Sequence, residues 1–128
     1  METTDPLTQL KFPIGPFEAG ENISRTELDE LINSIEAPPA KYRTATEKLS
    51  QSDLQKTYRE SAWNIQQLVN HVADMQMIHF LRMKKALTEP DYKEITMVNI
   101  QAWANTPGCL TFPVADSLDM IKGITHRF

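Results

Sequence analysis

The sequence contains a single cysteine, Cys109, in 128 residues. One cysteine excludes a disulfide within the chain and is typical of proteins from a reducing compartment. No apolar run approaches the roughly 20 residues that span a membrane, and the N-terminus lacks the basic region and apolar core of a signal peptide. We therefore expect a cytoplasmic protein with no membrane partner.

Basic residues are too few and too scattered for a nucleic-acid-binding surface. The chain carries 13 Lys and Arg against 17 Asp and Glu, a net charge of −4, and no run of Lys or Arg forms a basic stripe. A glycine-rich phosphate loop and a Ser-His-Asp pattern are also missing. Cys109 as a nucleophile would need a nearby base that the sequence does not show, so a small boundary residue is the favoured interpretation. The length suits one domain covering residues 1–128.

The apolar pattern predicts an all-α chain with an extended N-terminal arm. Residues 1–22 contain three prolines and no helical period, so we expect an arm that lies extended against the body. Residues 23–128 are expected to be helical. The first helix should begin at Ser24, because Glu27 completes a capping box, and should break near Ala37, where two prolines follow.

The best-defined element is a long helix that begins after Asn64 and ends before Pro90. Asn64 and Gln67 form a second capping-box pattern, and the apolar residues that follow fall on one broad arc at 100° per residue. Gln76 and His79 interrupt this arc. A buried amide or imidazole costs about 1–3 kcal/mol unless it is hydrogen-bonded. Each is therefore expected to have a hydrogen-bond partner, the commoner case, or a function in a pocket.

His71 lies at the border of the same arc, and periodicity alone makes it a boundary residue. A helix-borne imidazole is also a good metal ligand, because the helix fixes its direction and its second ring nitrogen can donate to a carboxylate. Asp74 is close enough in sequence to accept that bond, although an exposed aspartate is the commoner case. A catalytic zinc-like centre needs three protein ligands and an open position, so His71 alone does not define one.

The register of several short motifs resembles the DinB/YfiT-like family: Phe-Pro-Ile-Gly from Phe12, the Trp63 helix start, His-Val-Ala-Asp from His71 and the Ala-Trp pair ending at Trp103. The resemblance implies a four-helix bundle in up-down-down-up order. It also implies a divalent metal, Zn or Ni, held by one histidine of the second helix, here His71, and two of the fourth. Family members are described as metal-dependent hydrolases, or as transferases that join a low-molecular-weight thiol to an electrophile, as bacillithiol transferase does. Small-molecule electrophiles and thiols are the partners so implied.

Two departures from the family pattern matter for function. Gln76 stands where the family has a further histidine, and an amide cannot replace an imidazole as a basic ligand. The His-x-x-x-His element of the fourth helix is also absent, so we expect a bundle truncated to about three helices. Such a bundle exposes apolar faces, which favours a homodimer; the alternative is part of a longer gene product.

Two classes of function therefore remain open. The first is a metal-dependent enzyme with His71 as a ligand, Asp74, Gln76 and His79 as candidate pocket or supporting residues, and catalytic residues that the sequence does not reveal. The second is a non-catalytic helical interaction module that keeps the fold and has lost the metal site.

Overall fold

The computed structural model describes residues 5–18, 20 and 22–128, and within them every regular element is a helix. In chain order the helices are α1 (Pro6–Lys11), α2 (Arg25–Glu36), α3 (Pro38–Thr46), α4 (Gln51–Leu54), α5 (Ile65–Thr88), α6 (Ile100–Ala104), α7 (Pro107–Thr111) and α8 (Val114–Thr125). None of the helices in these residues combines the length and apolar character needed to cross a lipid bilayer. The expected all-α class is confirmed, whereas the single domain over residues 1–128 stays a prediction.

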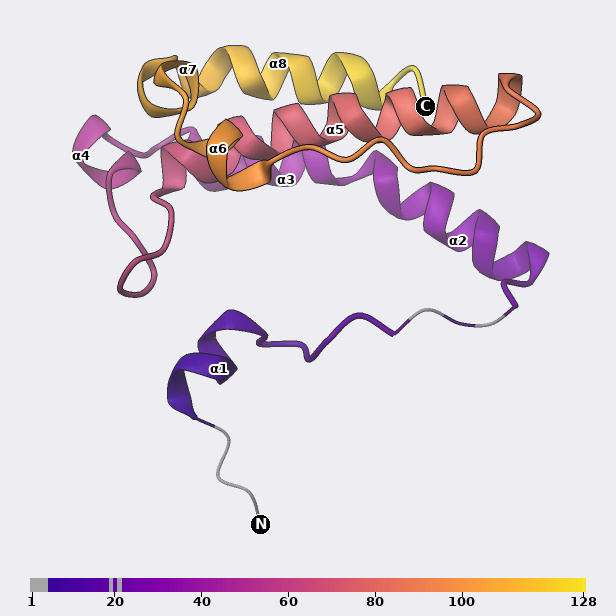
Figure 1. Ribbon diagram of the computed structural model, residues 1–128. Helices are drawn as coiled ribbons and strands as arrows, with labels where there is room; N and C mark the ends of the chain where they lie inside the picture. The colour runs from indigo at the N-terminus through magenta and orange to yellow at the C-terminus, as the bar shows by residue number, and fades with distance from the viewer. Residues whose placement is uncertain (1–4, 19, 21) are drawn as a thin grey trace.

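The bundle is organised around α5, and the shorter helix α8 lies alongside it (Figure 1). The predicted capping box starts α5: the Gln67 N–H donates to Asn64 Oδ1 at 2.8 Å, and the Asn64 N–H donates to Gln67 Oε1 at 3.1 Å. The helix ends at Thr88, just ahead of Pro90, as predicted. α3 packs against α8, and the short helices α6 and α7 pack against α5.

The core lies where the first half of α5 meets α4 and α8. Leu54, Val69, Val114 and Leu118 form its buried cluster. Partly buried Tyr42, Leu49 and Ile65 pack around that cluster. Removing these side chains from water stabilises the contact between α5 and α8, and this contact sets the position of every side chain on α5.

Three neighbouring amide side chains of α5 hold the segment that connects α6 to α8. The Gln66 side chain donates a hydrogen bond to the Phe112 carbonyl at 2.9 Å. The Gln67 side chain donates to the Ala104 carbonyl at 3.0 Å, and the Asn70 side chain donates to the Cys109 carbonyl at 3.0 Å. All three amides are buried. Because a buried carbonyl without a partner is costly, the amides fix this irregular segment against α5.

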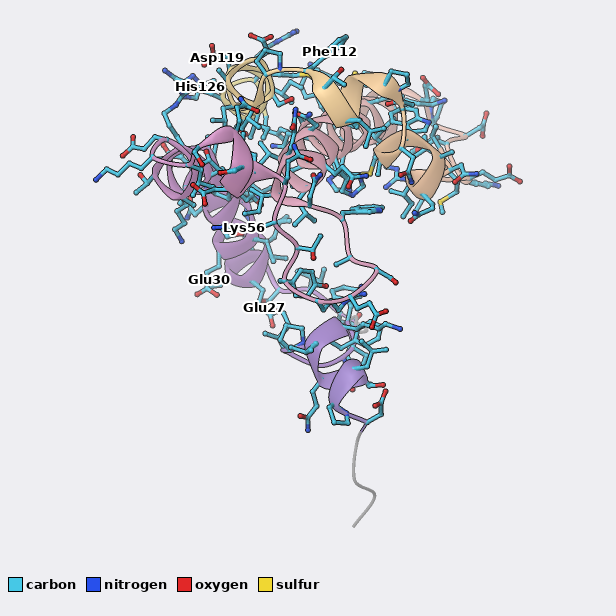
Figure 2. The ribbon with its side chains drawn as sticks, turned by 90° about the vertical axis from the view of Figure 1, so that its left-hand side faces the viewer. Glu27, Glu30, Lys56, Phe112, Asp119 and His126 are labelled. Atoms are coloured by element: carbon cyan, nitrogen blue, oxygen red, sulfur yellow. The ribbon has the colours of Figure 1, made fainter. Side chains whose placement is uncertain are left out.

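The break between α2 and α3 falls where the sequence predicts it. Ala37 is the one residue between the two helices, and Pro38 opens α3, where its missing N–H is not needed. The predicted capping box of Ser24 and Glu27 is present at the start of α2. Figure 2 shows Asp119 and His126 at the top of the molecule, above α2 with Glu27 and Glu30. α2 has no buried residue.

The extended arm was wrong for residues 6–11, which form α1. The Leu7 N–H donates to Asp5 Oδ1 at 3.3 Å, and Pro6 occupies the first helical turn, where its fixed φ suits a helix start. Residues 12–18 are non-helical, as expected, but Ile14 is 97 % exposed and Phe17 92 % exposed. The expected packing of the arm against the body is therefore not found at these residues. Residues 1–4, 19 and 21 of the predicted arm lie outside the described residues.

Candidate functional site

His71 lies two turns into α5, beside Trp63, which stands two residues before the helix begins. The Trp63 and His71 rings meet edge to face, with centroids 4.7 Å apart and an interplanar angle of 60°. Nδ1 of His71 is buried and has no hydrogen-bond partner among the described residues. Burial lowers the pKa of His71, and the charge of Asp74 opposes that shift only in part. The imidazole is therefore neutral at pH 7, the form that can bind a metal.

Asp74 does not take the supporting role that the sequence suggested for it. Its carboxylate Oδ2 accepts a hydrogen bond from Cys109 Sγ at 3.5 Å, and no hydrogen bond joins it to His71 in the described part of the chain. Burial, together with the negative charge of Asp74, raises the pKa of the Cys109 thiol. Cys109 is thus a buried neutral thiol, 5 % exposed, and its interpretation as a boundary residue was wrong.

Gln76 and His79 have different environments. Gln76 donates to Thr125 Oγ1 at 2.9 Å, so its amide is a satisfied polar link between α5 and α8, as the commoner case predicts. The expectation that His79 lies at the core edge with a hydrogen-bond partner was wrong. The residue is exposed and makes no hydrogen bond with any described residue.

The described residues fit one position of a metal site and no more. The chain has three histidines, and no cluster of three or more His, Cys, Asp or Glu side chains that could hold a metal occurs among residues 5–18, 20 and 22–128. The supporting hydrogen bond that a ligating histidine normally makes through its second ring nitrogen is also missing from Nδ1 of His71.

The sequence profile of the DinB superfamily matches residues 34–121. The chain belongs to this superfamily. The matched range contains α3 to α7, most of α8 and the whole environment of His71. The predicted family is therefore confirmed.

Curated DinB-like relatives extend the match to the full chain. "Putative metal-dependent hydrolase GK0616" of Geobacillus kaustophilus is 34 % identical over 128 residues, which are 100 % of this chain and 70 % of the relative. "Putative metal-dependent hydrolase YfiT" of Bacillus subtilis is 32 % identical over 119 residues, 93 % of this chain and 66 % of the relative. The chain thus corresponds to about two thirds of the length of these relatives.

A solved DinB-like structure has the same arrangement of helices. It is described as "YfiT from Bacillus subtilis is a probable metal-dependent hydrolase with an unusual four-helix bundle topology". The superposition has a TM-score of 0.87 at 32 % identity and covers 93 % of this chain and 67 % of that one. The predicted YfiT-like helical bundle is confirmed by this match.

Sequence reasoning missed the polar network beside the candidate site. Asn70 accepts a hydrogen bond from Ser117 Oγ at 2.7 Å and donates to the Cys109 carbonyl, and Asp74 lies one turn further along α5. The spacing of Asn70 and Asp74 marks one helix face. Their partners come from residues 109–117, and no local pattern in the sequence links the two segments.

Proposed function

We propose that this chain belongs to a metal-dependent hydrolase in which His71 is one of the metal ligands. The observation that carries the proposal is the environment of the His71 ring, which is half-buried and makes no hydrogen bond with the described residues. Relatives named as metal-dependent hydrolases that share about a third of its residues support it.

His71 offers a lone pair for a metal, and its position on α5 fixes the direction in which that lone pair can point. The backbone of α5 sets the path of the side chain, and the edge of Trp63 restricts rotation of the ring. A divalent cation such as Zn²⁺ or Ni²⁺ supplies Lewis acidity toward a water or a thiol when it is bound. Transfer of a low-molecular-weight thiol to a small electrophile is the finer form of the proposal, since a thiol and a water compete for the same kind of site.

We further propose that a second copy of the chain contributes to the site. Three protein ligands are the norm for a catalytic zinc centre, and the described residues place only His71 there. An apolar stripe on α2 is available for the contact, made of Leu28, Leu31 and Ile32, all exposed. A dimer formed through this stripe buries the apolar side chains, and the histidines of the second copy are the candidates for the ligands that one copy lacks.

The test is metal content per chain by elemental analysis, on protein purified without a histidine tag or chelator. His71→Ala is compared with His79→Ala, a matched control because His79 lies on the same helix but is exposed. We expect Zn or Ni that His71→Ala removes and His79→Ala retains. Light scattering of the same samples gives the mass of the metal-bound species, which we expect to be a dimer.

Two results would overturn parts of the proposal. Equal metal content in both variants would show that His71 is not a metal ligand. Metal bound by a monomer would show that a second copy does not contribute to the site. A wild-type chain that binds no metal favours the other class of function, a helical interaction module without a metal site. The specific observation on that side is the lack of a three-ligand cluster among the described residues.

A further inference from the structure

A cavity of about 330 Å³ lies beside Trp63, and no function has been assigned to it so far. Tyr58, Arg59, Ser61, Trp63, Leu68 and Gln101 line it. Most of these residues belong to the loop between α4 and α5, the long loop at the lower left of Figure 1. Trp63 also meets His71 edge to face. Trp63 is therefore shared by the cavity and by the contact with the His71 imidazole.

Arg59 supplies the charge of this cavity, as the one charged residue among the described residues that line it. Its Nε donates to Tyr58 Oη at 3.1 Å, and its Nη1 donates to the Glu60 carbonyl at 3.0 Å. The guanidinium also lies 5.2 Å from the centre of the Tyr58 ring. These contacts leave Nη2 with its donors unused, and no carboxylate within ion-pair distance occupies them in the described part of the chain.

The N-terminus of α5 does not provide an alternative charge for the cavity. Two of its first three N–H groups are already used: Ile65 donates to the Lys56 carbonyl, and Gln67 donates to the side chain of Asn64. The loop is also held in an unusual shape, because Ser61 has a φ of +57°, a left-handed conformation that costs a non-glycine residue about 1–3 kcal/mol. Arg59 is therefore the charged group that the described lining of the cavity offers.

We propose that this cavity binds the carboxylate of a small anionic molecule with an apolar or aromatic body, and that this molecule is the substrate of the His71 site. The last clause rests on the proposed function. A guanidinium pairs with a carboxylate through two parallel N–H donors, and Nη2 with the second proton of Nη1 offers such a pair. Trp63, Tyr58 and Leu68 provide the apolar walls, and the volume suits a molecule smaller than most drugs.

The test uses benzoate and benzamide, two probes of the same shape that differ in charge. Binding is followed by NMR at the indole N–H of Trp63, which makes no hydrogen bond with the described residues and is assigned by its loss in Trp63→Phe. We expect benzoate to bind more tightly than benzamide. Arg59→Gln should weaken benzoate binding about tenfold or more, because it removes a charge-assisted hydrogen bond, and should leave benzamide unchanged.

Two further variants separate charge from geometry and from general electrostatics. Arg59→Lys keeps the charge but not the fork, so it should recover part of the affinity. Arg25→Gln removes an exposed arginine on α2 and should have no effect. Equal binding of the two probes, or benzoate binding that survives Arg59→Gln, overturns the proposal. Tighter binding of inorganic phosphate than of benzoate overturns the assignment of a carboxylate.

Metal analysis on the same samples distinguishes this proposal from the proposed function. Arg59→Gln should keep its metal, and His71→Ala should keep its benzoate site. If His71 proves unrelated to metal while benzoate still depends on Arg59, the cavity is an anion site without the proposed catalytic partner. If metal content depends on His71 but benzoate affinity does not depend on Arg59, the proposed hydrolase function is retained and the proposed substrate class is wrong.

Discussion

Ser117 Oγ of α8 donates a hydrogen bond of 2.7 Å to Asn70 Oδ1 of α5, while the Asn70 amide donates to the Cys109 carbonyl at 3.0 Å. One buried side chain thus joins three segments, and both partners depend on it. Asn70→Ala should lower the free energy of unfolding by about 2–4 kcal/mol, because it leaves the buried Cys109 carbonyl and the partly buried Ser117 hydroxyl without this partner.

Urea unfolding followed by circular dichroism measures the Asn70→Ala effect. Ser117→Ala removes a single donor and should cost about 1–2 kcal/mol. Gln101→Ala is the surface control, since that amide is exposed, and should stay within about 0.5 kcal/mol of wild type. Similar values for Asn70→Ala and Gln101→Ala would mean that the network does not stabilise the bundle.

The contact between α5 and α8 should dominate stability, and a pair of leucines tests this. Leu118 is 6 % exposed and belongs to the core cluster, whereas Leu110 of α7 is 42 % exposed. Leu118→Ala should cost about 2–5 kcal/mol through lost burial and the cavity left behind. Leu110→Ala should cost much less in the same denaturation experiment. Equal costs would place the core elsewhere.

The stability of α4 should depend on pH through the ionisation of Asp53. Lys56 Nζ and Ser50 Oγ both donate to its carboxylate, each at 2.6 Å, and these bonds hold the pKa of Asp53 well below its ordinary value of 3.8. A lowered carboxyl pKa stabilises the folded turn fully above pH 3.8 and loses that contribution as the pH falls through the folded pKa. The carboxyl carbon resonance of Asp53 should therefore titrate at unusually low pH.

Lys56→Met tests the cause of the Asp53 shift. Lys56 has the largest effect on this carboxyl group, so the variant should raise the pKa of Asp53 toward its ordinary value. The bonds from Ser50 remain and should keep the pKa somewhat lowered. An unchanged titration in Lys56→Met would assign the whole shift to the helix cap.

Local signals in the sequence predicted the helix boundaries well. The capping boxes at Ser24 and Asn64 and the break at Ala37 lie where expected, because each depends on residues within one turn. The start of α1 was missed because Pro6 was taken as a helix breaker, although proline after a capping aspartate is a good first helical residue. The error was to treat Pro6 as a residue inside a helix, where proline is unfavourable, when it stands at the first position of one.

The candidate site was predictable only in part, because its partners are distant in the sequence. His71 could be singled out from its place on α5 and from the family motif. Its contact with Trp63 spans two turns and follows from neither. Asp74 was paired with His71 by proximity, yet it accepts its hydrogen bond from Cys109, 35 residues away. Such long-range pairs depend on how α7 packs against α5, and this packing cannot be read from the residue pattern of a single sequence.

The pairing of Asp74 with Cys109 gives a last prediction, on thiol reactivity. Burial is the main reason that the pKa of Cys109 is raised, and the charge of Asp74 and its hydrogen bond add to it. Asp74→Asn should therefore lower the pKa of Cys109, and each unit of decrease raises the thiolate fraction about tenfold below the pKa. Iodoacetamide should modify Asp74→Asn faster than wild type at pH 8, with a profile shifted to lower pH. Asp116→Asn is the matched control, because Asp116 lines the same small cavity as Cys109 but makes no hydrogen bond to the thiol. A faster reaction in both variants, without a shift of the profile, would indicate a more open structure and not a change in the thiol pKa.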